Sequence, residues 1–445
     1  MIIKLPKDVK YIIDKLQEAG YEAYAVGGCV RDTILGRCPD DWDITTSAKP
    51  LQIKELFKST IDTGIQHGTV TVMRSHIGYE VTTYRVDGEY EDNRHPKEVQ
   101  FTTSLIEDLK RRDFTINAMA YNETEGLVDE FGGMDDLNAG IVRCVGEPMD
   151  RFSEDALRIM RAVRFSAQLG FSIDPETKEA AKKLHKNLES ISAERINVEL
   201  TKLLVSDHPD YILDAYDMGI MDVVLPEFSH CMVTEQNNPH HCYTVGEHII
   251  KSMQAVDNDK VLRYTMLLHD IAKPCYKTTD ANGIDHFHGH AKNGASMAHS
   301  IMRRLRFDND TLYKVEKLVL NHDRDIETTR SAVRRAISQV GVDLFPLLLK
   351  VKQADLKAQS EYKQLEKQEK LGKVWSLYYE ITNANECVTL AQLKMNGHLL
   401  IEMGIAPGPR IGLILHELLD IVLDNPKYND KKYLQDYVKE KYIDA

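Results

Sequence analysis

Asp41 and Asp43 are two carboxylates separated by a single residue, near the start of a 445-residue chain. In an extended strand, residues two apart point to the same face, so these side chains would lie side by side. Because neighbouring anions repel each other unless a cation bridges them, the pair predicts a catalytic Mg²⁺ site. Metal ions held there can activate a hydroxyl and stabilise a leaving pyrophosphate. Glu80, on a later predicted strand, is a candidate third carboxylate, although a solvated glutamate explains it about equally well.

Gly27 and Gly28 precede this pair, after a short predicted strand and at the start of a predicted helix that carries Arg31. Glycines let a backbone approach a phosphate closely, and the first turn of a helix offers unpaired N–H groups. Gly28 and Arg31 are therefore candidate nucleotide-binding residues. A tight turn would explain the glycines alone, and an acidic surface turn would explain the aspartates alone. The short spacing between the two motifs favours a phosphate site.

A third charged segment, residues 154–164, is interpreted as helical, with Asp155 and Arg158 one turn apart on the same face. An aspartate accepts hydrogen bonds and an arginine donates them, so together they could match the pairing edge of a nucleobase. Arg161 and Arg164 extend a cationic stripe suited to a triphosphate or an RNA backbone. The alternative to base reading is a solvated helix face with salt bridges. The carboxylates of Asp41 and Asp43 upstream favour base reading over this alternative.

Residues 27–37, followed by Asp41 and Asp43, resemble the signature of class II tRNA nucleotidyltransferases and bacterial poly(A) polymerases. Later segments resemble further motifs of that family in the same order: 111–118, 154–165, 191–195 and 404–412. The resemblance implies that Asp41 and Asp43 bind Mg²⁺ and that Gly28 and Arg31 bind the triphosphate. It also assigns contacts with the incoming nucleotide to Arg112, Asp155, Arg158, Arg161 and Arg164.

The same resemblance implies template-independent addition of C, C and A to the 3′ end of tRNA, with CTP and ATP as substrates. Residues 84–96 resemble the flexible loop of family members that add adenosine, which favours full CCA addition over A-only addition. A poly(A) polymerase is a further alternative, although the sequence pI of about 5.7 is low for it. No membrane and no protein partner is inferred.

In the second half of the chain, His248, His269, Asp270 and Asp355 resemble the H…HD…D pattern of an HD domain. Mixed imidazole and carboxylate ligands suit manganese, iron, nickel or zinc, and such a metal could activate water against a phosphoester. His290 and His322 are candidate extra ligands. An HD phosphohydrolase whose head only docks RNA is therefore the alternative from another functional class, and an inactive HD fold is also compatible.

These residues need elements that position them. Strand-like runs occur at 24–26, 42–44, 69–73 and 79–84, whereas helical periodicity dominates from Ser153 onwards. The pattern predicts an α+β head, a nucleotidyltransferase-type sheet with helices, followed by an all-α neck, body, HD domain and tail. The predicted limits are 1–145 for the head, 146–235 for the neck and body, 236–360 for the HD domain, and 361–445 for an RNA-binding tail. Within the tail, Lys363, Lys367 and Lys370 are interpreted as a solvated helix face.

The composition, 42% hydrophobic and 28% charged, is that of a globular protein. No apolar run approaches the ~18 residues of a membrane span, and the start lacks a signal-peptide pattern, so we expect a cytoplasmic protein. Seven scattered cysteines without a C-x-x-C pair argue against disulfides or a cysteine zinc site. The net charge of −13 excludes coating of nucleic acid by charge alone. Residues 151–202 are nevertheless locally basic, with ten Lys and Arg against eight acids.

Overall fold

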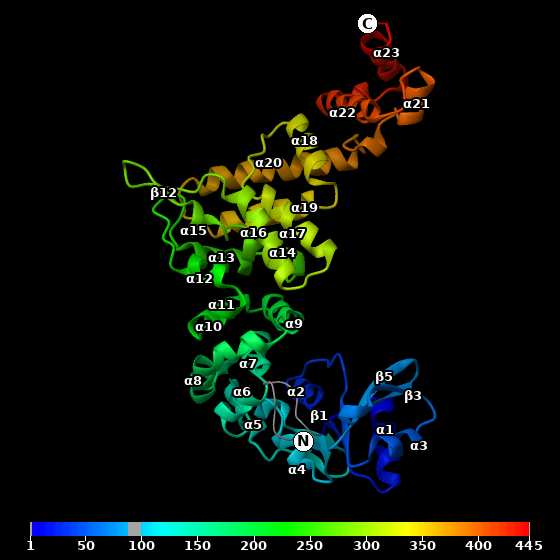
Figure 1. Cartoon of the computed structure of the whole chain (residues 1–445), viewed down its shortest axis with the longest axis vertical. Coiled ribbons are helices and arrows are strands. Elements are labelled where there is room, and N and C mark those ends of the chain that lie inside the picture. The colour runs from blue at the N-terminus through cyan, green and yellow to red at the C-terminus, as the bar shows by residue number, and fades with distance from the viewer. Residues whose placement is uncertain (1, 88–98, 445) are drawn as a thin grey trace. The chain divides into compact units, whose positions relative to one another are not determined.

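The computed structural model describes residues 2–87 and 99–444 and divides into two compact units, Met1–Pro226 and Glu227–Ala445. Figure 1 shows a sheet with surrounding helices in the first unit and an almost wholly helical second unit. The predicted fold class, an α+β head followed by helices, is confirmed. The four predicted domain limits remain predictions.

A seven-stranded sheet forms the centre of the head, in the strand order β3-β4-β5-β2-β1-β8-β9. β2 and β5 run parallel to each other, and the other neighbouring strands are antiparallel. The strands are β1 (Ala23–Val26), β2 (Ile44–Thr46), β3 (Thr60–Gly64), β4 (Thr69–Arg74), β5 (Ile77–Thr83), β8 (Ala120–Asn122) and β9 (Gly126–Val128). Two small pairs join β6 (Arg85–Asp87) to β7 (Val99–Phe101) and β10 (Ile141–Val142) to β11 (Ser172–Ile173). The strands predicted at 24–26, 69–73 and 79–84 are thus present.

The described part of the head also contains five α-helices, and one of them is the helix predicted to start at the glycine pair. Tyr24, Val26, Tyr84 and Leu109 belong to a buried apolar cluster that joins strands to a helix of the head. The head helices are α1 (Lys7–Glu18), α2 (Gly28–Ile34), α3 (Pro50–Leu56), α4 (Leu105–Lys110) and α5 (Gly133–Ala139). The strand β1 therefore leads directly into α2, so the glycine motif lies at the end of a buried strand.

The rest of the first unit is helical. Its helices are α6 (Pro148–Glu154), α7 (Leu157–Leu169), α8 (Pro175–Leu184), α9 (Ala193–Leu204), α10 (Ile212–Asp217) and α11 (Ile220–Val224). α7 is buried along most of its length and packs against α9. The prediction of one continuous helix across 154–164 is wrong, because α6 ends at Glu154 and α7 begins at Leu157.

The second unit contains helices α13 to α23, and α12 (Pro226–Met232) leads into it. Its helices are α13 (Val245–Gln254), α14 (Lys260–Leu268), α15 (Lys273–Tyr276), α16 (His290–Arg304), α17 (Asn309–Asn321), α18 (Arg330–Val340), α19 (Phe345–Lys357), α20 (Gln364–Asn383), α21 (Gly397–Glu402), α22 (Pro409–Asp424) and α23 (Lys431–Tyr442). A hairpin of β12 (Thr278–Thr279) and β13 (Asp285–His286) follows α15. One hydrophobic core includes Leu348 of α19, Val374 of α20 and Leu418 of α22, so α19 packs together with helices of the predicted tail.

Short 3₁₀ helices connect several elements: Ile65–His67, Thr115–Asn117, His185–Ser190, Pro209–Tyr211, Leu390–Gln392 and Pro426–Tyr428. Among the described residues, none of the helices combines the length and the apolar character that crossing a membrane requires. All seven cysteines are free.

Candidate nucleotide site and candidate metal centre

The glycine motif brings two arginines of the head together. Gly27 has a left-handed φ of +81°, and a Cβ atom added there would lie 3.0 Å from Nη1 of Arg112. Arg31 is buried, and it donates from Nη1 to Oδ1 of Asn117 and from Nε to Oδ1 of Asp32 at 2.9 Å. The guanidinium of Arg112 therefore packs on bare backbone, and the absence of a side chain at Gly27 is what makes room for it.

The acidic pair lies just before β2 and not within it, which corrects the predicted strand at 42–44. Regular pairing with β1 starts at Ile44, and beyond it the N–H of Val26 donates to the carbonyl of Asp43 at 3.0 Å. Asp41 and Asp43 are both exposed. The two carboxylates thus stand at the end of a strand, where they are open to a substrate.

Glu80 lies beside Asp43 on the neighbouring strand. Ile44 pairs with Val81 in the parallel β2–β5 ladder, so Asp43 and Glu80 each precede a paired residue and share one face of the sheet. Shielding by surrounding protein raises the pKa of Asp43, Arg112 lowers it, and the negative charges of Glu80 and Asp41 raise it. The clustering of three acids therefore favours a bound cation, and the oxygen donors fit Mg²⁺.

Asp155 and Arg158 do not lie on one helical face, which is a second correction. Asp155 has extended backbone angles between α6 and α7, and its Oδ1 accepts the N–H of Leu157 at 3.1 Å. Its Oδ2 accepts from Nη2 of Arg195 at 3.1 Å. Arg158 instead donates to Glu154 at 2.7 Å and to the carbonyl of Arg111 at 3.0 Å. Both predicted base readers are thus held by other residues, because Asp155 ends α6 and its carboxylate accepts the N–H of the first residue of α7.

The predicted cationic stripe is partly neutralised. Arg161 donates from Nε to Oδ2 of Asp113 at 2.8 Å, and Nε of Arg164 lies 2.7 Å from Oε2 of Glu199. Burial raises the pKa of Asp113, but the charge and hydrogen bonds of Arg161 outweigh it, so the pKa falls below its ordinary value. Burial lowers the pKa of Arg164 to about 10. Both guanidinium groups are therefore fixed by carboxylates from other segments.

Phe165 is a central residue of this site that the sequence did not single out. The guanidinium carbons of three arginines lie over its ring, at 5.0 Å for Arg31, 5.2 Å for Arg161 and 3.7 Å for Arg164. Such cation–π contacts stabilise both partners when they are shielded from water. The ring therefore joins Arg31 of α2 to the arginines of α7.

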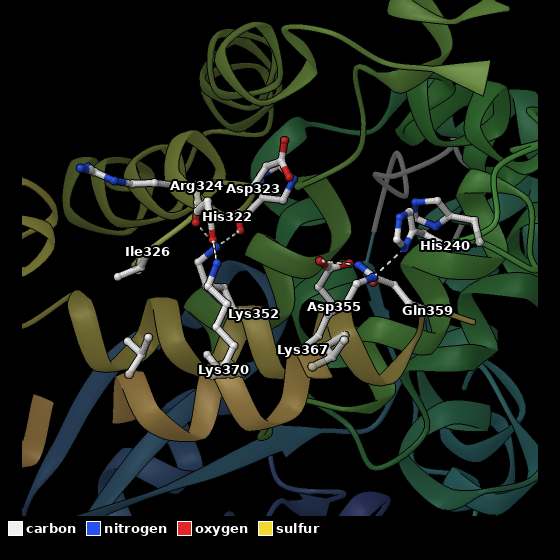
Figure 2. Close-up of a pocket in the computed structure, with 15 residues that line it drawn as sticks. His240, His322, Asp323, Arg324, Ile326, Lys352, Asp355, Gln359, Lys367 and Lys370 are labelled. Atoms are coloured by element: carbon white, nitrogen blue, oxygen red, sulfur yellow. Dashed lines mark hydrogen bonds and ion pairs between the residues drawn. The ribbon is translucent and has the colours of Figure 1, made fainter. Parts of the chain in front are cut away.

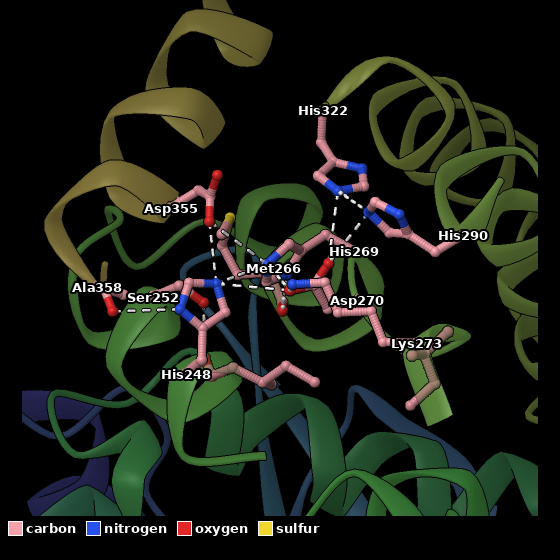
Figure 3. Close-up of polar contacts among 12 residues, drawn as sticks. His248, Ser252, Met266, His269, Asp270, Lys273, His290, His322, Asp355 and Ala358 are labelled. Carbon is pink, nitrogen blue, oxygen red and sulfur yellow. Dashed lines mark hydrogen bonds and ion pairs between the residues drawn. The ribbon is translucent and has the colours of Figure 1, made fainter. Parts of the chain in front are cut away.

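In the second unit, the predicted HD residues converge on one centre (Figure 3). His248 comes from α13, His269 and Asp270 follow α14, and Asp355 lies on α19. Nε2 of His248 lies 2.9 Å from Oδ1 of Asp355 and 3.2 Å from Nε2 of His269. The structure thus brings together all four predicted HD residues.

The two oxygens of Asp270 face different histidine pairs. Oδ2 lies 3.3 Å from Nε2 of His269 and 3.6 Å from that of His248. Oδ1 lies 3.5 Å from Nε2 of both His290 and His322. In each group of three residues, the potential donor atoms lie within 4.8 Å of one another. The centre therefore offers two adjacent three-ligand positions that share one carboxylate.

The ring hydrogen bonds show that these histidines suit cations. The Nδ1 atoms of His248, His269, His290 and His322 each lie 2.7–3.2 Å from a backbone carbonyl. A carbonyl only accepts, so Nδ1 carries the proton and each Nε2 directs a lone pair into the centre. Two lone pairs 3.2 Å apart repel each other, as between His290 and His322, unless a cation lies between them. The donor set therefore fits bound metal.

Two cavities open beside this centre, with volumes of about 400 and 260 Å³. Both are lined by His241, His322, Asp323, Asp355 and Gln359. Figure 2 shows Lys352, Lys367 and Lys370 on the wall of the larger cavity. Lys367 and Lys370 were expected on a solvated face, and the structure places them at this cavity instead.

The sequence also did not single out Lys273 and Gln236. Nζ of Lys273 lies 2.7 Å from Oδ2 of Asp270 and donates to Oε1 of Gln236 at 2.8 Å. Lys273 follows Asp270 by three residues, which is a local spacing that could have signalled this contact. Gln236 lies in a loop far away in sequence, so no local spacing indicates its contact with Lys273.

Comparison with known proteins matches this arrangement. Three family models match in order: "Poly A polymerase head domain" at 23–143, "Probable RNA and SrmB- binding site of polymerase A" at 170–232, and "HD domain" at 240–367. The CCA-adding enzyme of Lactobacillus johnsonii is 33% identical over 441 residues, which are 96% of this chain and 95% of that protein. The chain belongs to the CCA-adding enzyme family.

Other members of the family share a shorter segment at higher identity. The CCA-adding enzyme of Leuconostoc mesenteroides is 51% identical over 216 residues, so the match spans 48% of this chain and about half, 54%, of that relative. The crystal structure of the Bacillus stearothermophilus CCA-adding enzyme in complex with CTP is 28% identical, covers 98% of both chains and has a TM-score of 0.72. The predicted family and fold are thereby confirmed.

Proposed function

We propose that this chain adds C, C and A to the 3′ end of tRNA from CTP and ATP without a nucleic-acid template. The observation that carries the proposal is the cluster of Asp41, Asp43 and Glu80 beside Arg112 and the glycine motif. The membership of the CCA-adding enzyme family and the CTP bound to the Bacillus stearothermophilus relative support it. Because its substrate would be tRNA, we infer a cytoplasmic location.

In the proposed reaction, the 3′ oxygen of the RNA forms a bond to the α-phosphorus, the bond to pyrophosphate breaks, and the proton of the hydroxyl passes to water. Asp41 and Asp43 would hold Mg²⁺, which supplies Lewis acidity to the phosphate oxygens. Gly28, Arg31 and Arg112 would hold the triphosphate. The remaining proposed nucleotide contacts are Asp155 and Arg158 for the base, and Arg161 and Arg164 for charge.

A-only addition and poly(A) synthesis are the alternatives at the same site. The loop that favours full CCA addition, residues 84–96, lies mostly outside the described residues. Incubation with tRNA lacking its 3′ end and with labelled CTP or ATP separates these activities by product sequencing. We expect CCA on tRNA alone. Addition of A only, or ATP-dependent tails on mixed RNAs, would replace the proposal with one of the alternatives.

A second activity is supported by the paired ligand groups around Asp270. We infer that the HD centre is a metal-dependent phosphohydrolase site, held by His248, His269, Asp270 and Asp355 together with His290 and His322. Manganese, iron, nickel or zinc would suit these donors and would lower the pKa of a water molecule. Elemental analysis of the purified chain and phosphatase assays with added metal provide the test. No bound transition metal and no hydrolysis with any of the four ions would overturn this second proposal.

A further inference from the structure

Two lysines at the larger cavity of the HD centre have only neutral partners (Figure 2). Nζ of Lys352 donates to the backbone carbonyls of His322 at 2.7 Å and Arg324 at 2.6 Å. Nζ of Lys367 lies 2.6 Å from Oε1 of Gln359 and 2.9 Å from Nδ1 of His240. Within residues 2–87 and 99–444, no ion pair within 4.0 Å joins either ammonium to a carboxylate.

This lack of pairing distinguishes them from neighbouring lysines on the same helices. Lys350 of α19 lies 2.7 Å from Oδ2 of Asp257, and Lys370 of α20 pairs with Asp325. Lys352 and Lys367 are only partly exposed. Asp323, Asp325 and Asp355 also line the cavity and attract Lys352 at longer range, but none of them forms an ion pair with either ammonium group. A partly buried cation without a carboxylate in direct contact is costly in free energy, so the two lysines can together attract an anion.

Both lysines are connected to candidate metal ligands. Lys352 holds the carbonyl of His322. Gln359, which accepts from Lys367, itself donates from Nε2 to Oδ2 of Asp355 at 3.1 Å. His322 and Asp355 also line the cavity. The two ammonium groups therefore line a cavity that includes two candidate metal ligands, and each is linked to one of these ligands directly or through a single side chain.

We propose that Lys352 and Lys367 form an anion subsite that holds a second phosphate of a substrate whose reacting phosphate lies at the HD centre. The inference rests on the proposed phosphohydrolase activity and narrows its substrate class to phosphoanhydrides. In their hydrolysis, the oxygen of water forms a bond to one phosphorus, the bridging P–O bond breaks, and the two water protons end on the two phosphate products. A phosphomonoester leaves the subsite empty.

Binding of non-hydrolysable probes tests the subsite without any turnover. Methylenediphosphonate carries two linked phosphonates and methylphosphonate carries one, and calorimetry gives the ratio of their Kd values. In the wild-type chain we expect the Kd of methylphosphonate to exceed that of methylenediphosphonate at least about tenfold. This ratio should fall about tenfold in Lys352→Gln and in Lys367→Gln, since each variant loses a charge-assisted contact with the second phosphonate. Lys373→Gln is the matched control, because Lys373 is an exposed lysine of the same helix, α20.

Any contribution of the nucleotide site in the head is the same in all three variants, so differences among them report on the cavity of the HD centre. Retained Mn²⁺ binding and an unchanged thermal transition show that a variant is folded. A wild-type ratio near one, or a ratio that stays unchanged in both Lys352→Gln and Lys367→Gln, overturns the subsite.

Hydrolysis assays separate this inference from the activity on which it rests. In the lysine variants we expect the KM for pyrophosphate to rise about tenfold and the KM for p-nitrophenyl phosphate to stay constant. Equal rises in both KM values contradict the subsite. If the wild-type chain hydrolyses neither compound, the phosphohydrolase proposal fails, and the ratio of Kd values still decides whether the lysines hold a second phosphate.

Discussion

Arg195 holds the carboxylate of Asp155 at 3.1 Å, across forty positions of the chain. Asp155 therefore has its two oxygens engaged by different partners, the N–H of Leu157 and the guanidinium of Arg195. The orientation of this proposed base reader depends on α9, where Arg195 lies, and not on the neighbouring Arg158. A helix remote in sequence thus positions the residue that would select the nucleotide.

Arg195→Met should loosen Asp155 and reduce the discrimination between CTP and ATP, because a mobile carboxylate accepts from either base. We expect the ratio of kcat/KM values for correct and incorrect nucleotides to fall about tenfold, with tRNA binding less affected. Lys202→Met, at an exposed lysine of the same helix, should leave the ratio unchanged. Equal discrimination in Arg195→Met and Lys202→Met would show that Asp155 needs no such support.

Gly27→Ala tests whether the packing of Arg112 on bare backbone matters for nucleotide binding. The new Cβ would lie 3.0 Å from Nη1 of Arg112 and would be strained at φ +81°. Gly20→Ala is a matched control, because Gly20 has φ +86° and open space around its Cβ position. Both variants should lose about 1–2 kcal/mol in urea unfolding. Only Gly27→Ala should also lose kcat/KM, by about tenfold or more, and similar kinetics in both would contradict the contact.

Glu80→Gln asks whether the third carboxylate belongs to the magnesium site. Removing its charge should raise the Mg²⁺ concentration needed for half-maximal nucleotide transfer and lower kcat about tenfold, because one oxygen ligand becomes weaker. Glu55→Gln, at an exposed glutamate of the same unit, should behave like the wild type. If the Mg²⁺ titration is the same for both variants, Glu80 is a solvated side chain and not a ligand of the magnesium site.

Asp113 makes a pH-dependent contribution to stability. Arg161 and Asn117 hold its pKa below the ordinary value when the chain is folded. Stability from this carboxylate is therefore present above the unfolded pKa of about 3.9 and is lost as the pH falls towards the lower folded value. Asp113→Asn should cost about 1–3 kcal/mol at pH 7, with the difference from wild type shrinking below about pH 4. Exposed Asp135→Asn should show no such trend, and a pH-independent cost for Asp113→Asn would exclude this linkage.

The shared carboxylate of Asp270 predicts a metal stoichiometry. The wild-type chain should bind two transition-metal ions, His290→Ala one, and Asp270→Ala none with high affinity, as measured by calorimetry and elemental analysis. His299 lies on the same helix as His290 but pairs with Glu316, so His299→Ala should still bind two metal ions. One ion per chain in both the wild type and His290→Ala would reduce the centre to a single metal.

The local motifs were predictable because their chemistry lies in adjacent residues. The glycine pair needed only a strand followed by a helix, and the HD pattern needed only the order and spacing of its histidines and aspartates along the chain. The single helix across 154–164 was wrong because charged residues at helical spacing also fit two helices separated by a cap. Here the extended backbone of Asp155 ends the first helix, and its carboxylate accepts the N–H of Leu157, where the second helix begins.

Partners from distant segments were not predictable. Spacing along the chain does not encode that Glu199 meets Arg164, or that Phe165 lies beneath Arg31. Lys367 resembled any lysine among glutamates, and nothing next to Lys352 in sequence set it apart, because the surroundings of both come from segments far away in sequence. Tertiary packing decides such contacts, and the residues' positions along the chain do not reveal how distant segments pack.

The most direct measurement of the central claim is product sequencing after incubation of tRNA that lacks its 3′ end with CTP and ATP, using the wild-type chain and Asp41→Asn. We expect the wild-type chain to complete C, C and A, and Asp41→Asn to lose transfer by at least about a thousandfold while it remains folded and still binds tRNA. Transfer by Asp41→Asn at the wild-type rate, or wild-type products without cytidine, would contradict it.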